Sequence, residues 1–191
     1  MNRQKSVLLF TVFVDMVCFG MIIPVLPYIS KELALSDFLY GLLAAVFPLM
    51  NFLFSHLWGS LSDRKGRRPV MLVSIAITLA ANLLLAITYN LPGLLVARIF
   101  AGIGSANFSV AQAYMSDITP IEQRTKNMGM IGAAFGLGFI FGPPLGGWLK
   151  DLSGPGSVLW VGLGAAILNL INLVSARFFL KESNQNINET Y

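Results

Sequence analysis

Between two long apolar runs the chain reads Gly59-Ser60-Leu61-Ser62-Asp63-Arg64-Lys65-Gly66-Arg67-Arg68-Pro69. The runs cover about residues 38–61 and 70–89. Each is long enough to cross a membrane, because an α-helix needs roughly 20 apolar residues to span about 30 Å of hydrocarbon. The charged stretch is too short for a folded domain and is rich in basic residues. It therefore predicts two membrane-spanning helices joined by a short basic loop.

Four further apolar runs bring the number of expected membrane-spanning helices to six. The expected spans are residues 7–28, 38–61, 70–89, 93–117, 128–149 and 157–180. The gaps between them are short and contain Gly, Pro, Asn and Asp, which favour turns. The sequence thus predicts an all-α integral membrane protein, with one six-helix transmembrane domain over residues 1–181. Residues 182–191 are polar and are expected to form a disordered cytoplasmic tail.

The composition supports a membrane protein and argues against other classes. Of the 191 residues, 55% are hydrophobic and 12% are charged, and the mean hydropathy is +0.71. A soluble domain carries about 25% charged residues. No basic block is longer than residues 64–68, so the net charge of +4 does not predict nucleic-acid binding. Cys18 is a lone cysteine, and no cluster predicts a metal, a cofactor or an enzymatic site.

The distribution of lysine and arginine predicts the orientation. If the N-terminus is cytoplasmic, the basic residues of the inner side are Arg3, Lys5, Arg64, Lys65, Arg67, Arg68, Arg124, Lys126, Arg177 and Lys181. The outer side then holds only Lys31 and Lys150. Cytoplasmic loops of membrane proteins carry the excess of positive charge. We therefore expect both termini in the cytoplasm, in a multi-pass protein of the cell's inner or plasma membrane.

Asp15 and Arg98 are the charged residues that lie well inside the predicted spans. A charge at the centre of a membrane helix costs at least about 2.5–3.5 kcal/mol, so it usually faces a cavity or a partner. One interpretation is a buried ion pair that holds helices together. The other, which we favour, is a carboxylate at Asp15 that exchanges a proton during transport and an arginine that modulates it. Whether the two side chains touch is left open by their positions along the helices.

Other polar residues of the spans are harder to assign. Asn107 and Gln112 share the fourth predicted helix with Arg98, and we take them as candidates for lining a cavity. His56 lies near the end of the second span, where a hydrogen-bonded structural histidine is favoured over a titrating one.

The fifth predicted helix is unusually rich in glycine. Gly138, Gly142 and Gly146 repeat every four residues and form a stripe that allows close approach of another helix. Pro143 and Pro144 remove two backbone donors and predict a kink. The pattern fits plain tight packing, and it also fits a bending element in an alternating-access transporter.

Several of these segments resemble signatures of the major facilitator superfamily. The loop of residues 59–69, between the second and third spans, resembles the family's G-x-L-x-D-R-x-G-R-R/K loop. This implies a cytoplasmic gating loop made by Gly59, Asp63, Arg64, Gly66, Arg67 and Arg68. Residues 98–104 are similar to its R-x-x-x-G-x-G stretch, in which the arginine is associated with proton coupling. Residues 138–147 resemble a motif associated with drug antiporters, and the matching residues are Gly138, Gly142, Pro143, Gly146 and Gly147. Asp15 and the stretch Pro24-Val25-Leu26-Pro27 are similar to the tetracycline and multidrug efflux branch.

The resemblance implies a particular architecture. Members of the family have two six-helix halves, and each half is built from two inverted three-helix repeats. This chain provides six helices, so it is either a half-sized protein acting as a dimer or the N-terminal half of a longer one. The partner expected from this is a second half-transporter, in the simplest case a second copy. The family places the loop between the second and third helices beside the eleventh helix, which corresponds to the fifth helix of the first half.

The function implied by the resemblance is proton-coupled export of small amphipathic organic molecules or drugs by antiport. Its partners would be a small-molecule substrate, the proton and the lipid bilayer. Two alternatives stay open: a non-transporting membrane scaffold or assembly module, and a nutrient uptake carrier. Buried charges at Asp15 and Arg98 argue against a scaffold, and the direction of proton-driven flux separates an exporter from an uptake carrier.

Overall fold

The structure is a computed structural model that describes residues 3–184, and within this range all regular elements are helices. They are α1 (Arg3–Ile22), α2 (Val25–Glu32), α3 (Asp37–Lys65), α4 (Arg67–Ile87), α5 (Leu91–Ser105), α6 (Phe108–Asp117), the 3₁₀ helix η1 (Ile121–Gln123), α7 (Arg124–Ser153) and α8 (Leu159–Phe179). Six helical stretches of this part of the chain are long and apolar enough to cross a membrane, which confirms the predicted fold. Most of the expected tail, residues 185–191, lies outside the described residues.

The first and fourth spans are each broken into two helices, whereas the sequence predicted continuous ones. The first span breaks between α1 and α2, where Pro24 has no N–H to continue the helix. The fourth span breaks between α5 and α6 at Ala106 and Asn107, neither of which is a helix breaker. The side chain of Asn107 instead turns inward and donates to Ser74 Oγ of α4 at 3.0 Å. Tertiary contacts accompany this second break, which is why the sequence did not reveal it.

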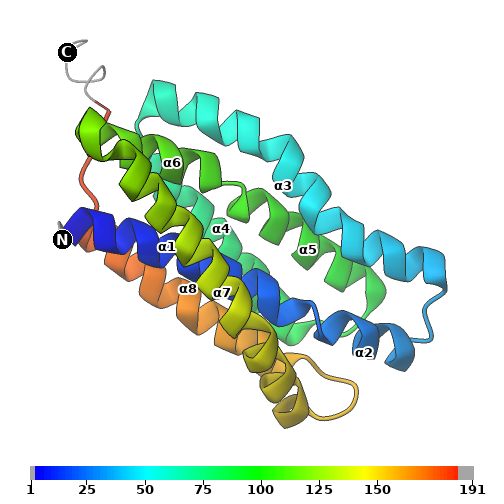
Figure 1. Ribbon diagram of the computed structural model, residues 1–191. Coiled ribbons are helices and arrows are strands. Elements are labelled where there is room, and N and C mark those ends of the chain that lie inside the picture. The colour runs from blue at the N-terminus through cyan, green and yellow to red at the C-terminus, as the bar shows by residue number, and fades with distance from the viewer. Residues whose placement is uncertain (1–2, 185–191) are drawn as a thin grey trace.

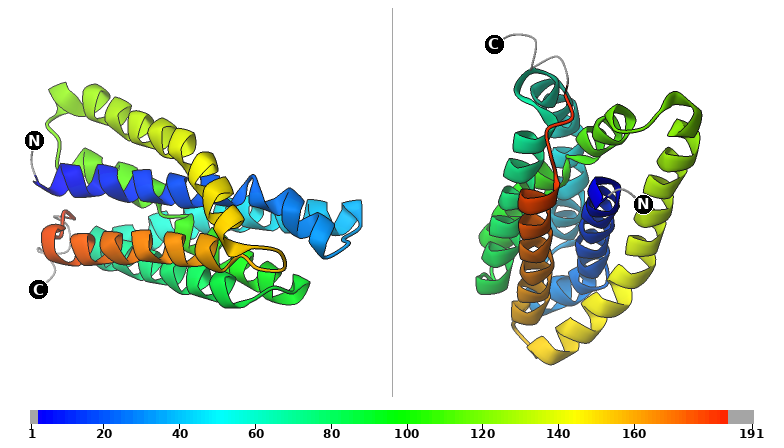
Figure 2. Two further views of the ribbon diagram at one scale, coloured as in Figure 1. Left: turned by 90° about the horizontal axis from the view of Figure 1, so that it is seen from below. Right: turned by 90° about the vertical axis from the view of Figure 1, so that its left-hand side faces the viewer.

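The six spans form two inverted repeats of three. The first span of the first repeat, α1, packs on α7 of the second repeat, and the first span of the second repeat, α5, packs on α3 of the first repeat in the same way (Figures 1 and 2). Likewise α8 packs on α1 as α4 packs on α5, while α4 and α8 pack on each other. Exchanging spans one to three with spans four to six therefore reproduces the packing. The fourth span runs opposite to the first, so the two repeats are inverted.

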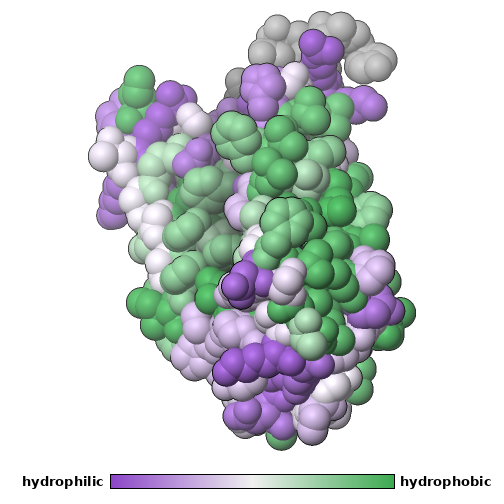
Figure 3. All heavy atoms as spheres, turned by 90° about the vertical axis from the view of Figure 1, so that its right-hand side faces the viewer, coloured by the Kyte–Doolittle hydropathy of each residue, from purple (hydrophilic) through white to green (hydrophobic). Residues whose placement is uncertain are grey.

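The start of α1 and the end of α8 lie at the same end of the bundle (Figure 1). The loop between α3 and α4 lies at this end as well, because an even number of spans separates it from each terminus. We call this end, which carries the basic residues of 64–68, the basic end. On the face drawn in Figure 3, hydrophobic side chains cover broad stretches of the surface and hydrophilic ones gather in patches. This distribution suits a bundle whose sides contact lipid.

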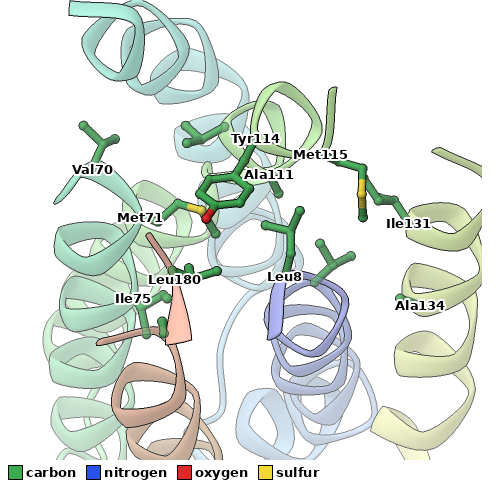
Figure 4. Packing of buried hydrophobic residues seen from close by; sticks show 13 residues of the cluster. Leu8, Val70, Met71, Ile75, Ala111, Tyr114, Met115, Ile131, Ala134 and Leu180 are labelled. Carbon is green, nitrogen blue, oxygen red and sulfur yellow. The ribbon is translucent and has the colours of Figure 1, made fainter. Parts of the chain in front are cut away.

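Two apolar clusters fill the interior. The cluster nearer the basic end surrounds Tyr114, which is fully buried and lies close to Met71, Leu180 and Leu8 (Figure 4). The Tyr114 hydroxyl donates to Lys181 O at 2.6 Å, so this polar group is satisfied within the core. The cluster joins α1, α4, α6, α7, α8 and Leu180, which follows α8.

Candidate proton-coupling site

Asp15 lies in the middle of α1 and its carboxyl group is inside the bundle. The residue is only 4% exposed and interacts with the side chain of Asn107, at the break of the fourth span. Asn107 donates to Ser74, so the contact joins the first, third and fourth spans. Within residues 3–184, Asp15 Oδ1 has no hydrogen-bond partner. This oxygen can accept a proton without breaking an existing hydrogen bond.

Arg98 of α5 is held by the neighbouring helix α3. Its Nε donates to Leu43 O at 3.3 Å and its Nη2 to Ala44 O at 3.4 Å. The guanidinium carbon lies 5.0 Å from the centre of the Phe47 ring, a cation–π distance. No ion pair in the described part of the chain joins Arg98 to Asp15. The structure therefore brings the two charged residues into the same core but gives each a neutral partner.

A small cavity lies beside Arg98, between α1, α3, α4, α5 and α8. Its polar lining comes from Cys18, Thr78, Asn82, Arg98 and Ser105. The cavity has a volume of about 30 Å³, which is room for about two water molecules. Asn82 Nδ2 has no hydrogen-bond partner within residues 3–184, so the cavity borders one unsatisfied donor as well as the guanidinium.

The remaining polar candidates lie in different surroundings. Asn107 is buried in the core beside Asp15, whereas Gln112 is exposed on α6. His56 is exposed and borders an open groove near the basic end, together with Asp63 and Ser109. Cys18 is half-buried and accepts a hydrogen bond from Asn169 Nδ2 at 3.2 Å, which joins α1 to α8.

The loop between α3 and α4 is organised by Arg67. Its guanidinium contacts Asp63 Oδ1 at 2.5 Å and Asp117 Oδ2 at 3.2 Å, and it donates to Ser62 Oγ at 2.6 Å. These contacts tie the loop to the end of the fourth span. Asp63 keeps 63% of its side chain exposed, and Arg64 is exposed too.

Glu182, which follows α8, caps the start of α4. Its two carboxylate oxygens accept from Arg67 N at 2.9 Å and from Arg68 N at 3.2 Å, as suits an anion at a helix N-terminus. Gly66 precedes them with a φ of 101°, and a Cβ at this position would contact the Glu182 carboxylate. Arg68 Nη2 donates to Arg177 O at 2.9 Å. The first residues of the expected tail thus pack on the loop instead of leaving the domain at residue 182.

Asp117 and Glu182 were not among the residues expected from the sequence. Asp117 is the last residue of α6, where the negative end of the helix dipole disfavours an acidic side chain unless a cation is near. That position was a signal that could have pointed to a basic partner. Glu182 carried no such signal, because its partners are backbone N–H groups more than a hundred residues away in the chain.

The glycine stripe of the fifth span packs on α1. Its members Gly138, Gly142 and Gly146 are all buried. A Cβ would lie 2.6 Å from Phe13 O at Gly138 and 2.7 Å from Val17 O at Gly142, so the two backbones are in direct contact. Gly147 has no neighbouring atoms within 4 Å of such a Cβ, so it takes no part in this contact.

A second ionic cluster lies at the end of the bundle opposite the basic end. Lys150 of α7 is 5% exposed, although the sequence placed it simply on the outer side. Its Nζ contacts Glu32 Oε1 at 3.4 Å and donates to Gly154 O at 2.8 Å. The Tyr89 hydroxyl also donates to Glu32. The cluster ties the outer ends of the first and fifth spans to the turn after the third.

Comparisons with known proteins agree with this architecture. The chain is 40% identical over 187 residues to the tetracycline resistance protein, class C, of Escherichia coli, a match that covers 96% of this chain and 46% of that protein. It is 31% identical over 154 residues to the quinolone resistance protein NorA of Staphylococcus aureus (strain N315), covering 80% and 40%. The crystal structure of the human organic anion transporter MFSD10 (TETRAN) superposes with a TM-score of 0.79 at 25% identity, covering 95% and 48%.

The chain therefore spans less than half the length of each of these relatives. A family model nevertheless matches residues 8–190, which is almost the whole chain. That model describes the Major Facilitator Superfamily, and the chain belongs to this family.

Proposed function

We propose that the chain forms one half of a proton-coupled exporter of small amphipathic organic molecules, working by antiport. The observation that carries the proposal is the carboxyl group of Asp15, buried in the core with one oxygen free of hydrogen-bond donors within residues 3–184. A buried ionisable group inside a membrane helix is costly and indicates a functional role. Its neighbour Asn107 lies at the break between α5 and α6.

The class of substrate is inferred from the relatives and from an open groove over α1. The relatives are tetracycline and quinolone resistance proteins, whose names specify ring compounds. The groove is bordered by α1, α3 and α7, and its aromatic lining includes Phe19, Phe47 and Phe135. Asn51 adds a polar group. Aromatic faces with a few polar atoms suit amphipathic ring compounds.

The basic end is proposed to face the cytoplasm, with both termini on that side of the cell's inner or plasma membrane. The support is the asymmetry of lysine and arginine between the two ends. Residues 182–184 would then form a cytoplasmic edge of the domain and residues 185–191 the cytoplasmic tail.

A second six-helix half is proposed to complete the transporter, and a second copy of the chain is the form we test. The second and fifth spans support this, because only 17% and 22% of their apolar windows are buried within the domain. In the first and fourth spans the corresponding shares are 50% and 56%. The two poorly buried spans present the surface that a partner half could cover.

The test is proton-driven movement of tetracycline, used as the probe, in vesicles that contain the purified 191-residue chain. We expect a pH gradient to drive the probe against the proton flux, and Asp15→Asn to reduce transport to the level of protein-free vesicles, because the amide cannot exchange a proton. Asp151→Asn is the matched control, since this aspartate is exposed at the end of α7. Full proton-driven transport by Asp15→Asn removes Asp15 from the mechanism. Movement of tetracycline in the same direction as the protons identifies an uptake carrier. If the chain is shown to be a dimer in the vesicles and tetracycline does not move, the non-transporting membrane scaffold is favoured.

A further inference from the structure

Pro48 interrupts the hydrogen bonding of α3 at the level of Arg98. Proline has no backbone N–H, so the carbonyl of Ala44, four residues earlier, loses its helical donor. A carbonyl without a donor inside a membrane domain is costly unless another group supplies one. In this structure Arg98 Nη2 supplies it, at 3.4 Å from Ala44 O.

The rest of the contact holds the guanidinium over the same turn of α3. Arg98 Nε donates to Leu43 O at 3.3 Å, and the Phe47 ring lies beneath the guanidinium at 5.0 Å. Leu43 O still has its own helical donor, whereas Ala44 O does not. The proline-freed carbonyl is therefore the acceptor that the helix itself leaves available for Arg98.

Gly102 brings the two helices close enough for this contact. It lies one turn after Arg98 on α5, and a Cβ there would be 2.6 Å from Phe47 O and 2.8 Å from Met50 Cβ. The backbones of α5 and α3 thus touch beside Pro48. The Phe47 ring also stacks on Phe19 of α1 at 4.9 Å, and Phe19 follows Asp15 by one helical turn.

We propose that Pro48 is a positioning residue for Arg98: it frees the Ala44 carbonyl that anchors the guanidinium on α3, beside the cavity. The consequence for proton exchange rests on the proposed function, whereas the anchoring itself does not. Restoring the helical hydrogen bond at position 48 removes the need for Arg98 at Ala44 O. The guanidinium then becomes free to turn into the neighbouring cavity.

The anchoring is tested by NMR of the chain in lipid nanodiscs with ¹⁵N-labelled arginine. The Arg98 Nε resonance is assigned by its absence in Arg98→Lys. In Pro48→Ala the Nη2 bond to Ala44 O is replaced by the helical one, so we expect the guanidinium to leave α3 and its Nε bond to Leu43 O to break as well. The Nε resonance should then shift and its proton should exchange with water about tenfold faster, as fits the loss of one charge-assisted hydrogen bond. Folding is not at risk, because alanine adds a helical donor and improves helix propensity.

Leu49→Ala is the matched control, because Leu49 is half exposed on the next position of α3 and its change leaves Pro48 in place. We expect its Arg98 resonance to stay as in the unmodified chain. An Arg98 resonance that is the same in Pro48→Ala and in the unmodified chain overturns the proposal, whatever the transport assay gives.

The consequence of this anchoring for proton-driven transport is tested by a double-mutant cycle in the tetracycline assay. If Pro48 acts through Arg98, Pro48→Ala impairs proton-driven transport alone but adds no further loss in an Arg98→Lys background. Losses that multiply in the double variant overturn the link to Arg98, since Pro48 then acts only on the shape of α3. If the unmodified chain moves no tetracycline, the proposed function fails while the NMR comparison still decides the anchoring.

Discussion

At the scale of single residues, the charged groups of the core are stabilised by neutral partners. Asp15 interacts with the Asn107 amide, and Arg98 donates to two backbone carbonyls and lies over an aromatic ring. Removing one partner of a directly paired buried charge leaves the other uncompensated. Neutral partners avoid this cost, so Asp15 can gain or lose a proton without unpairing Arg98.

The buried lysine at the opposite end gives a prediction at this scale. We expect Lys150→Gln and Glu32→Gln each to lower stability by about 1–3 kcal/mol, because each leaves buried or partly buried polar groups unpaired. The double variant should lose less than the sum, with a coupling of about 0.5–3 kcal/mol. Thermal unfolding in detergent measures this, and exposed Lys31→Gln serves as the control. Strictly additive losses would mean that the two side chains do not interact.

At the scale of elements, the contact between α1 and α7 is made by backbone. Gly142 of α7 meets Gly20 of α1, and Pro143 lies against the same glycine. The proline removes a helical donor within this stretch of close contact between the two helices. The close contact and the kink therefore coincide, and the bending of α7 is set where it packs on the Asp15 helix.

The stripe gives a prediction with an internal control. Gly142→Leu should destabilise the domain by about 1–3 kcal/mol or more, because the side chain would enter the space of the α1 backbone. Gly147→Leu should change stability by no more than about 0.5 kcal/mol, since that position faces open space. Unfolding midpoints of the two variants in the same detergent decide between them. Equal effects at both positions would show that α7 does not depend on close packing against α1.

At the scale of the whole molecule, the inverted repeat relates the two ionic clusters. Arg67, at the loop between the second and third spans, binds Asp117 at the end of the fourth span. Lys150, at the loop between the fifth and sixth spans, binds Glu32 at the end of the first. Exchanging the two repeats converts one pair into the other. Each end of the domain is therefore closed by an ion pair that joins one repeat to the other.

Assembly of two copies gives the prediction for the whole molecule. A two-fold axis along the membrane normal would place Asp63 of one copy near the start of α7 of the other, where unpaired N–H groups favour an anion. Asp63 already pairs with Arg67 but stays 63% exposed, so it remains available to a partner. Cysteines at Asp63 and Met128, on a Cys18→Ser background, should cross-link between chains in native membranes. Cross-links only within one chain, or a monomer in those membranes, contradict the dimer.

The six spans, and the glycine stripe of the fifth, could be predicted from the sequence because they depend on local composition. Run length against bilayer thickness and small-residue spacing along a helix are properties of neighbouring residues. The partners of Arg98, the break at Asn107 and the capping of α4 by Glu182 could not, because each joins segments far apart in the chain. A buried polar group must find a partner, but the packing of the helices determines which one is within reach.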